Sequence, residues 1–236
     1  MAAVTRHDSG KAARILTVSR DLVLRRGVRG VTIAEIAEKA HVGKGTVHLY
    51  FGTKEDLVVG LFARDFLAVV EQYIQTLTTD PDQVRPQRLC PLLVRTALDH
   101  PFVRALQIGD VDMLGILGEH PLSKELLGTL GPGSMMYSLL PVWRRYQLAR
   151  TDWALDEQAY ALRAVIAGFF EVAAHPHVLP DVTVDFPEQV MAGAVAALLS
   201  PDQANPADVR AAAQECVRML ADSRAVILAS IAPTKQ

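Results

Sequence analysis

Residues 32–51 read TIAEIAEKAHVGKGTVHLYF, and this stretch decides how the chain folds at its start. Apolar residues recur at helical spacing in its first half, which predicts a short helix with one apolar face: Ile33, Ile36, Ala37 and Ala40. Thr32 precedes this run and Glu35 follows three residues later. This spacing predicts a capping box that fixes where the helix begins.

A tight turn is expected at residues 41–43. Gly43 can take the positive φ that such a turn needs, and Val42 supplies an apolar plug beneath it. A second short helix follows. Its inner face is expected to hold Val47, Tyr50 and Phe51. Its outer face carries Lys44, Gly45, Thr46, His48 and Leu49.

Two short helices joined by a three-residue turn form a helix-turn-helix motif. The second helix must enter a DNA major groove about 12 Å wide, so its leading residues must be small or able to reach base edges. Gly45 and Thr46 are small, and Leu49 can touch a thymine methyl group. Lys44, Thr46 and His48 can hydrogen-bond to bases or phosphates. The pattern favours DNA binding over its alternative, a helical hairpin without a nucleic-acid role.

The stretch resembles the DNA-binding domain of the TetR (tetracycline-repressor-like) family of bacterial regulators, over roughly residues 11–62. The shared pattern is Thr-x-x-x-Ile-Ala, then Ala-x-Val-Gly-Lys-Gly-Thr-Val, then Tyr-Phe, then Thr-Lys-Glu-Asp-Leu at 53–57. The resemblance implies that Thr32, Tyr50 and Lys54 contact DNA phosphates. The family usually has an aromatic residue where His48 stands, and often His or an aromatic residue where Leu49 stands. No base preference therefore carries over.

Composition and charge agree with a folded DNA-binding protein. Of 236 residues, 50% are hydrophobic, which suits one or two domains with a sizeable core. Residues 1–64 hold 11 Lys and Arg against 6 Asp and Glu, a net +5, whereas the remainder holds 13 against 20. A basic first quarter on an acidic body suits a module that faces phosphates, although chance imbalance is the alternative.

The chain has no feature of a secreted or membrane-spanning protein. The N-terminus lacks an apolar run of signal-peptide length. The longest apolar region, 159–174, is interrupted by Arg163 and Glu171, so no membrane span is expected. Cys90 and Cys216 lack metal-ligand spacing, and we expect reduced, buried thiols in a cytoplasmic protein.

Beyond the motif the pattern is helical and lacks strand-like alternation, so the expected fold is all-α. We expect a three-helix helix-turn-helix DNA-binding domain at 1–62 and a helical effector-binding and dimerisation domain at 63–236. The predicted helices span about 11–26, from 53 to beyond 73, a late-starting or bent helix within 82–99, then 101–118, 123–130, 134–149 with a kink at Pro141, 156–174, 187–200 and 206–230.

A homodimer is expected, because one such head contacts too few base pairs for useful specificity and two heads read a palindromic operator. The helix at 156–174 has a stripe of small residues that lets another helix approach closely. We expect a four-helix bundle formed by 156–174 and 206–230 of each subunit. Its candidate residues are Ala164, Ala167, Gly168, Glu171, His175, Val217 and Leu220.

The resemblance also implies an effector bound inside the helical body, and an adaptable apolar pocket suits Met and aromatic residues. Its candidate residues are Met113, Met135, Met136, Trp143, Tyr146, Phe169 and Phe170. Core packing is the alternative for each of them. The expected function is a repressor that a small, mostly apolar ligand releases from DNA. The alternative is a DNA-binding regulator of the same fold without a small-molecule gate.

Enzymatic and metal-binding readings have little support. Glu171 and His175 are one helical turn apart, but no third ligand or metal-binding spacing is evident. No nucleophile motif, phosphate-binding glycine loop or carboxylate pair appears. We therefore expect no catalysis, no metal and no cofactor.

Overall fold

The computed structural model describes residues 10–110, 132–175 and 182–230, and all regular structure in these ranges is helical. The all-α expectation is confirmed. The described chain divides into two compact units. The first contains residues 10–67, 101–110 and 225–230, and the second contains 68–100, 132–175 and 182–224. The domain boundary predicted after residue 62 stays a prediction.

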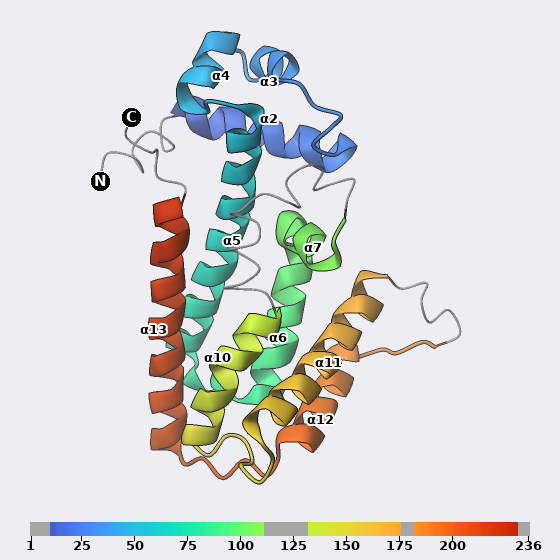
Figure 1. The fold of residues 1–236 in the computed structure, drawn as a ribbon, viewed down its shortest axis with the longest axis vertical. Coiled ribbons are helices and arrows are strands. Elements are labelled where there is room, and N and C mark those ends of the chain that lie inside the picture. Colours follow the sequence, from blue (N-terminus) through green and yellow to red (C-terminus); the bar gives the residue numbers. More distant parts are fainter. Residues whose placement is uncertain (1–9, 111–131, 176–181, 231–236) are drawn as a thin grey trace. The chain divides into compact units, whose positions relative to one another are not determined.

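The first unit contains the helix-turn-helix (Figure 1). Its helices are α2 (Gly10–Arg26), α3 (Ile33–Lys39), α4 (Lys44–Tyr50) and the first part of α5 (Lys54–Thr79). Helix α2 packs against both α3 and α4. The apolar face of each helix meets the others in a small core that includes Ile15, Leu16, Val23, Ile36, Val47, Phe51, Leu57 and Phe62.

Helix α3 begins as the capping pattern predicts, but only half of the capping box forms. The Thr32 hydroxyl oxygen accepts a hydrogen bond from the Glu35 backbone N–H at 3.3 Å. The Glu35 carboxylate does not return to the cap. It accepts from Arg26 Nη2 at 2.5 Å and so ties α3 to the end of α2.

The predicted role of Gly43 in the turn is wrong. Gly43 has an ordinary φ of −73° and is the N-cap of α4, whereas His41 has the positive φ, 52°. The reason is how α3 ends. The His41 N–H donates to Glu38 O at 3.1 Å and the Val42 N–H to Ala37 O at 2.9 Å. In this arrangement the residue after the C-cap takes the left-handed conformation, and His is one of the non-glycine residues enriched there.

Helix α5 begins with a complete capping box. The Thr53 hydroxyl accepts from the Asp56 N–H at 3.0 Å, and the Asp56 carboxylate accepts from the Thr53 N–H at 2.9 Å. The helix continues past Tyr73, as predicted, and ends at Thr79. Lys54 is therefore the first residue of a long, well-anchored helix.

Helix α7 (Pro101–Ile108) also belongs to the first unit and is shorter than predicted. We expected it to reach about residue 118. Gly109, with φ 65°, ends it, and the Asp110 N–H donates back to Ala105 O at 2.9 Å. This is the hydrogen bond of a glycine-terminated helix. The helix predicted at 123–130 lies outside the described residues.

The second unit is a bundle around α6 (Pro86–Asp99). Its other elements are the rest of α5, a 3-10 turn at Pro81–Val84, α10 (Pro132–Arg145), α11 (Leu155–Ala174), α12 (Pro187–Leu199) and most of α13 (Pro206–Ser230). Helix α6 packs against α11 and α12, which lie side by side, and α10 packs against α11 (Figure 1). No helix within the described ranges is long and apolar enough to cross a membrane.

Helix α10 differs from its prediction at both ends. It begins at Pro132 rather than after a Ser134 cap, and it ends at Arg145 rather than near Ala149. Gln147 has a φ of 59°, and the Leu148 N–H donates back to Trp143 O at 2.8 Å. A left-handed residue therefore turns the chain where the sequence pattern continued to look helical.

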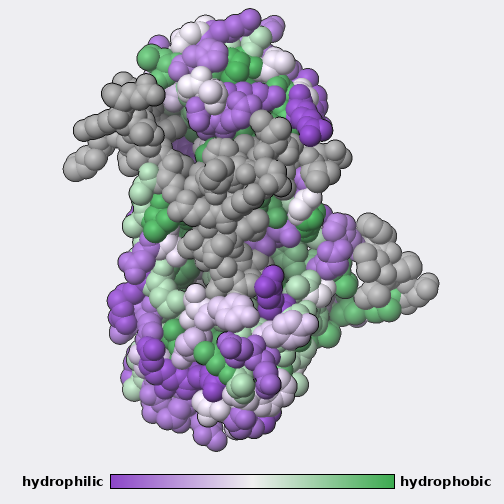
Figure 2. Space-filling view, in the orientation of Figure 1, coloured by the Kyte–Doolittle hydropathy of each residue, from purple (hydrophilic) through white to green (hydrophobic). Residues whose placement is uncertain are grey.

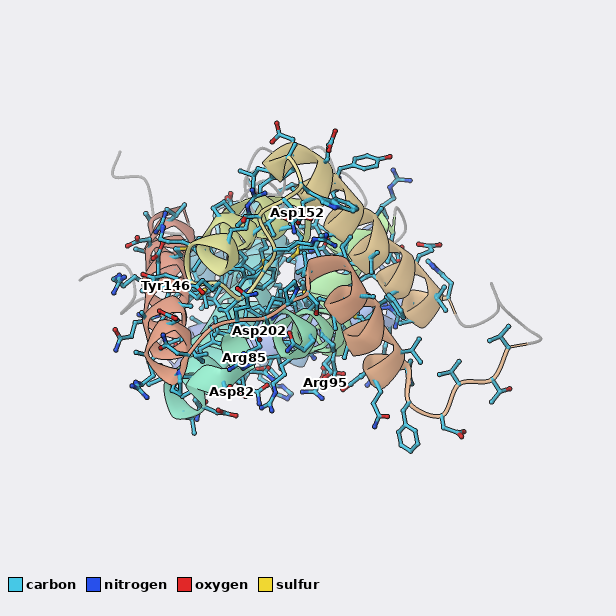
Figure 3. The ribbon with its side chains drawn as sticks, turned by 90° about the horizontal axis from the view of Figure 1, so that it is seen from below. Asp82, Arg85, Arg95, Tyr146, Asp152 and Asp202 are labelled. Atoms are coloured by element: carbon cyan, nitrogen blue, oxygen red, sulfur yellow. The ribbon has the colours of Figure 1, made fainter. Side chains whose placement is uncertain are left out.

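An ion-pair network closes one end of the second unit. Arg85 donates through Nε to Asp82 at 2.7 Å and through Nη1 to Asp202 (Figure 3). Asp202 lies just before α13, so the network joins the start of α6 to that connection.

Candidate nucleic-acid interface

The outer face of α4 presents the side chains predicted to read DNA. Val47 is fully buried and Leu49, two residues on, is 66% exposed, so the helix has a clear inside and outside. Lys44, Gly45 and His48 are exposed with Leu49. Among the described residues, no heavy atom of another element lies within 4 Å of where a Gly45 Cβ would be, so this position is open.

The inner face of α4 is close to its prediction. Val47 and Phe51 are buried in the core of the first unit. Thr46 and Tyr50 are half-buried. Tyr50 can therefore keep its ring against the protein and its hydroxyl at the surface, as an amphipathic side chain does.

His48 has a hydrogen bond that sequence reasoning missed. Its Nδ1 lies 3.0 Å from the carbonyl oxygen of Gly52. A carbonyl only accepts, so Nδ1 must carry the proton. In the neutral ring this leaves Nε2 as an acceptor. The spacing alone did not indicate it, because the bond forms only when the chain turns back after α4 ends at Tyr50.

The three residues predicted to contact phosphates differ in how exposed they are. Thr32 is exposed, and its hydroxyl oxygen accepts from Glu35 while its proton remains able to donate. Lys54 is half-buried in the first turn of α5. Together with Tyr50 they come from the start of α3, the end of α4 and the start of α5. Their contact with DNA stays a prediction.

The residues predicted to line an effector pocket differ in burial and in hydrogen bonding. Met136, Trp143 and Phe170 are buried, and the Trp143 indole N–H donates to Val84 O at 2.8 Å. Met135 is half-buried. Tyr146 is also half-buried; its hydroxyl donates to Glu215 at 3.0 Å, and this bond raises the Tyr146 pKa. Met113 lies outside the described residues.

Phe169, another of these predicted residues, lines a surface groove. The groove lies where α6, α11 and α12 meet and has a volume of about 190 Å³. Its walls are mostly apolar and include Pro91, Val94, Leu98, Phe169 and Met191. Arg95 and Glu188 pair across its rim at 3.1 Å.

The candidate dimer residues on α11 lie on an open face. Ala164, Ala167, Gly168 and Glu171 are exposed, and nothing lies within 4 Å of where a Gly168 Cβ would be. His175 Nδ1 lies 3.1 Å from the Glu171 carboxylate. On α13, Val217 is half-buried and Leu220 is only 7% exposed.

Sequence reasoning missed an apolar surface beside this face. Large apolar side chains are exposed on α11, on the approach to α12 and on α12 itself, namely Tyr160, Val182, Val184, Phe186 and Val190. The extended segment at 182–186 forms an apolar edge of the surface in Figure 2. Residues 182–186 read Val-Thr-Val-Asp-Phe, and all five are exposed, so the sequence alternation did not indicate which of them would be buried.

No group of three or more candidate metal ligands occurs within residues 10–110, 132–175 and 182–230. Cys90 and Cys216 are both free and buried.

Comparison with known proteins agrees with the geometry of α3 and α4. Residues 15–61 match the family described as bacterial regulatory proteins, tetR family. An uncharacterised helix-turn-helix-type transcriptional regulator from Haemophilus influenzae is 29% identical over 75 residues. That match covers 32% of this chain and only 38% of the relative's length.

Two solved structures share the fold at low identity. The fatty acid degradation regulator FadR from Bacillus halodurans is 17% identical, with a TM-score of 0.57 over 84% of this chain and 99% of that one. A HlyIIR mutant protein is 15% identical, with a TM-score of 0.51 over 81% of this chain and 98% of the other. The likeness therefore extends beyond the helix-turn-helix to most of the chain.

Proposed function

Because this chain belongs to the TetR family of bacterial regulatory proteins, we propose that it is a sequence-specific DNA-binding transcriptional regulator, acting as a repressor that a small, mostly apolar ligand releases from its operator. The observation that carries the DNA-binding part is the exposed outer face of α4 over a firmly packed inner face. A helix packed in this way can insert its polar side into a major groove while its inner face stays packed against the core of the first unit.

Each exposed residue of α4 has a chemical role in this proposal. Lys44 donates to phosphates or to guanine. Gly45 lets the helix backbone approach the DNA closely, and Thr46 hydrogen-bonds to a base edge. His48 offers Nε2 to a base or phosphate because Gly52 holds Nδ1. Leu49 contacts a thymine methyl group.

We propose that the active form is a homodimer on a palindromic operator. The exposed small-residue face of α11 supports this, because Ala164, Ala167 and Gly168 leave room for a partner helix. The exposed Phe186 and Val190 extend the same kind of surface to α12. Leu220 is buried within its own chain, so α12 is better placed than that part of α13 to complete the interface.

Ligand gating requires the second unit to take two conformations. Trp143 is packed and hydrogen-bonded, so an effector near it has to displace core side chains. An ungated regulator of the same fold remains the alternative. The two differ in whether a small molecule changes the DNA affinity, since a ligand acts only through unequal affinity for two conformations.

The experiment that tests DNA binding is selection of bound fragments from the host's genomic DNA, followed by binding measurements on the enriched sequence. Wild-type protein should retain a defined duplex, and Thr46→Ala and His48→Ala should reduce discrimination between the selected and scrambled duplexes. Arg210→Ala, an exposed arginine on α13, is a control for loss of charge. If Lys44, Thr46 and His48 can all be changed to Ala without altering affinity, α4 does not read the DNA.

Gating is tested with the same duplex and a panel of apolar metabolites and antibiotics. Trp143 is buried and Trp153 is 39% exposed, so the fluorescence emission of the two tryptophans should respond differently to binding. An effector should release the duplex and change emission in the wild type, with a much smaller change in Trp143→Phe. A panel that does neither favours the ungated regulator.

A further inference from the structure

Asp65 is a buried carboxylate at the meeting point of three helices. It lies on α5 and is only 8% exposed. Its Oδ2 accepts a hydrogen bond from the Phe102 backbone N–H at 3.0 Å, in the first turn of α7. Since Pro101 before it has no N–H, Asp65 caps the start of α7 from outside that helix.

Arg20 brings α2 to the same carboxylate. Its Nη2 lies 4.0 Å from Asp65 Oδ1, and its guanidinium carbon lies 6.0 Å from the centre of the Phe102 ring. Phe102 is fully buried and its ring centre is 4.9 Å from that of Phe62 on α5. Charge, a backbone hydrogen bond and an aromatic pair thus join α2, α5 and α7 at one point.

The contacts of Asp65 with Phe102 and Arg20, here called the joint, lie within the first unit. Only His100 separates α7 from α6, and α6 is the helix around which the second unit packs. On the other side, α2 packs against α3 and α4. Asp65 therefore connects α7 to the helix that supports α3 and α4.

We propose that Asp65 is a positioning residue that couples α7 to the DNA-binding helices, with Arg20 as its partner on α2. This inference rests on the proposed DNA binding. The inference goes beyond the proposed function because it assigns the coupling to one buried carboxylate. With the joint intact, α7 and α2 shift as one body. Without it, DNA bound at α4 no longer senses α7.

Reciprocity allows a test that needs no effector. If α7 biases DNA binding, then DNA binding must bias α7 by the same free energy. We would measure amide hydrogen exchange of residues 102–108 in the full chain, with and without the duplex obtained by genomic selection. In the wild type, the duplex should slow exchange in α7 by at least a fewfold.

Two variants remove the attraction between Asp65 and Arg20 and leave an acceptor for the Phe102 N–H. Asp65→Asn keeps an oxygen for the Phe102 N–H and removes the charge that attracts Arg20. Arg20→Gln removes the same attraction from a side chain that is 42% exposed, where the fold tolerates change. Arg20→Gln should bind the duplex within about threefold of Arg25→Gln, which loses the same positive charge, and Asp65→Asn should bind it within about threefold of the wild type. Both should lose the DNA-induced slowing in α7.

Arg25→Gln is the matched control, because it removes one charge from an exposed position on the same helix. It should keep the DNA-induced slowing. Asp65→Ala adds a measurement without DNA: it leaves the Phe102 N–H unpaired, so exchange in α7 should rise by about tenfold or more while α6 stays unchanged.

The outcomes distinguish this inference from the proposed function. Wild-type protein that retains no genomic duplex overturns the proposed DNA binding and this inference with it. Wild-type protein that binds DNA but shows no change in α7 overturns the coupling alone. Slowing that persists in both Asp65→Asn and Arg20→Gln shows that the carboxylate does not carry the coupling.

Discussion

Lys54→Ala should make DNA binding less dependent on salt. Lys54 begins α5, where the Thr53–Asp56 capping box holds the helix start. If its ammonium group neutralises one phosphate, a dimer releases two counterions through this residue. Each contributes about 0.9 to the slope of log affinity against log salt, so the slope should become shallower by about 1.8. Between 50 and 200 mM salt the ratio of wild-type to mutant affinity should then fall by about 12-fold.

The assay is fluorescence anisotropy of the selected duplex at several salt concentrations. The same loss of affinity is expected on scrambled duplexes, because phosphate contacts carry no sequence information. Arg210→Ala removes an equal charge from α13 and should leave the slope unchanged. An unaltered slope in Lys54→Ala, or an equal change in the control, would refute the assigned phosphate contact.

Three further outcomes are expected. Gly168→Trp should convert the dimer to a monomer in analytical ultracentrifugation, since open space around Gly168 lets the monomer accept the ring; an intact dimer would remove this face of α11 from the interface. Burial raises the pKa of Cys216 to about 12 and also raises that of Cys90, so at pH 8 a disulfide reagent should react on the order of a thousandfold more slowly with folded than with unfolded protein; rapid reaction in the folded state would contradict the burial. Asn205→Ala should lower stability by about 1 kcal/mol in a urea titration, because the Asn205 side chain accepts from the Ala207 and Asp208 N–H groups at 2.8 and 3.0 Å, and Asn205→Asp should retain most of it; equal losses in both would argue against the cap.

The first unit could be predicted from the sequence because its signals are local. Thr53 with Asp56, and Thr32 before α3, specify helix starts within three residues of chain. The same holds for Asn205 and Pro206 at the start of α13. Candidate DNA-reading residues follow from helix spacing alone, since Val47 inside fixes which neighbours lie outside.

What escaped prediction depends on contacts that spacing does not encode. The positive φ fell on His41 rather than Gly43, because the hydrogen bonds that end α3 require it one residue after the C-cap. Tyr146 and Trp143 look alike as aromatic pocket residues. The structure gives one a hydroxyl bonded to Glu215 and the other a fully buried indole bonded to Val84.

The length of α7 shows how one such error bears on function. An apolar pattern beyond Gly109 suggested a long helix, in which α7 would have been one more member of the body. With its end at Ile108 it is a two-turn helix, begun by a carboxylate from α5 and packed through Phe102 against Phe62. Its apolar face is buried through Phe102, Val103, Ala105 and Leu106, and the Asp65 carboxylate fixes its first turn. We therefore expect regulation transmitted through α7 to be sensitive to Asp65, although Asp65 lies on neither the DNA-facing helix nor the proposed dimer face.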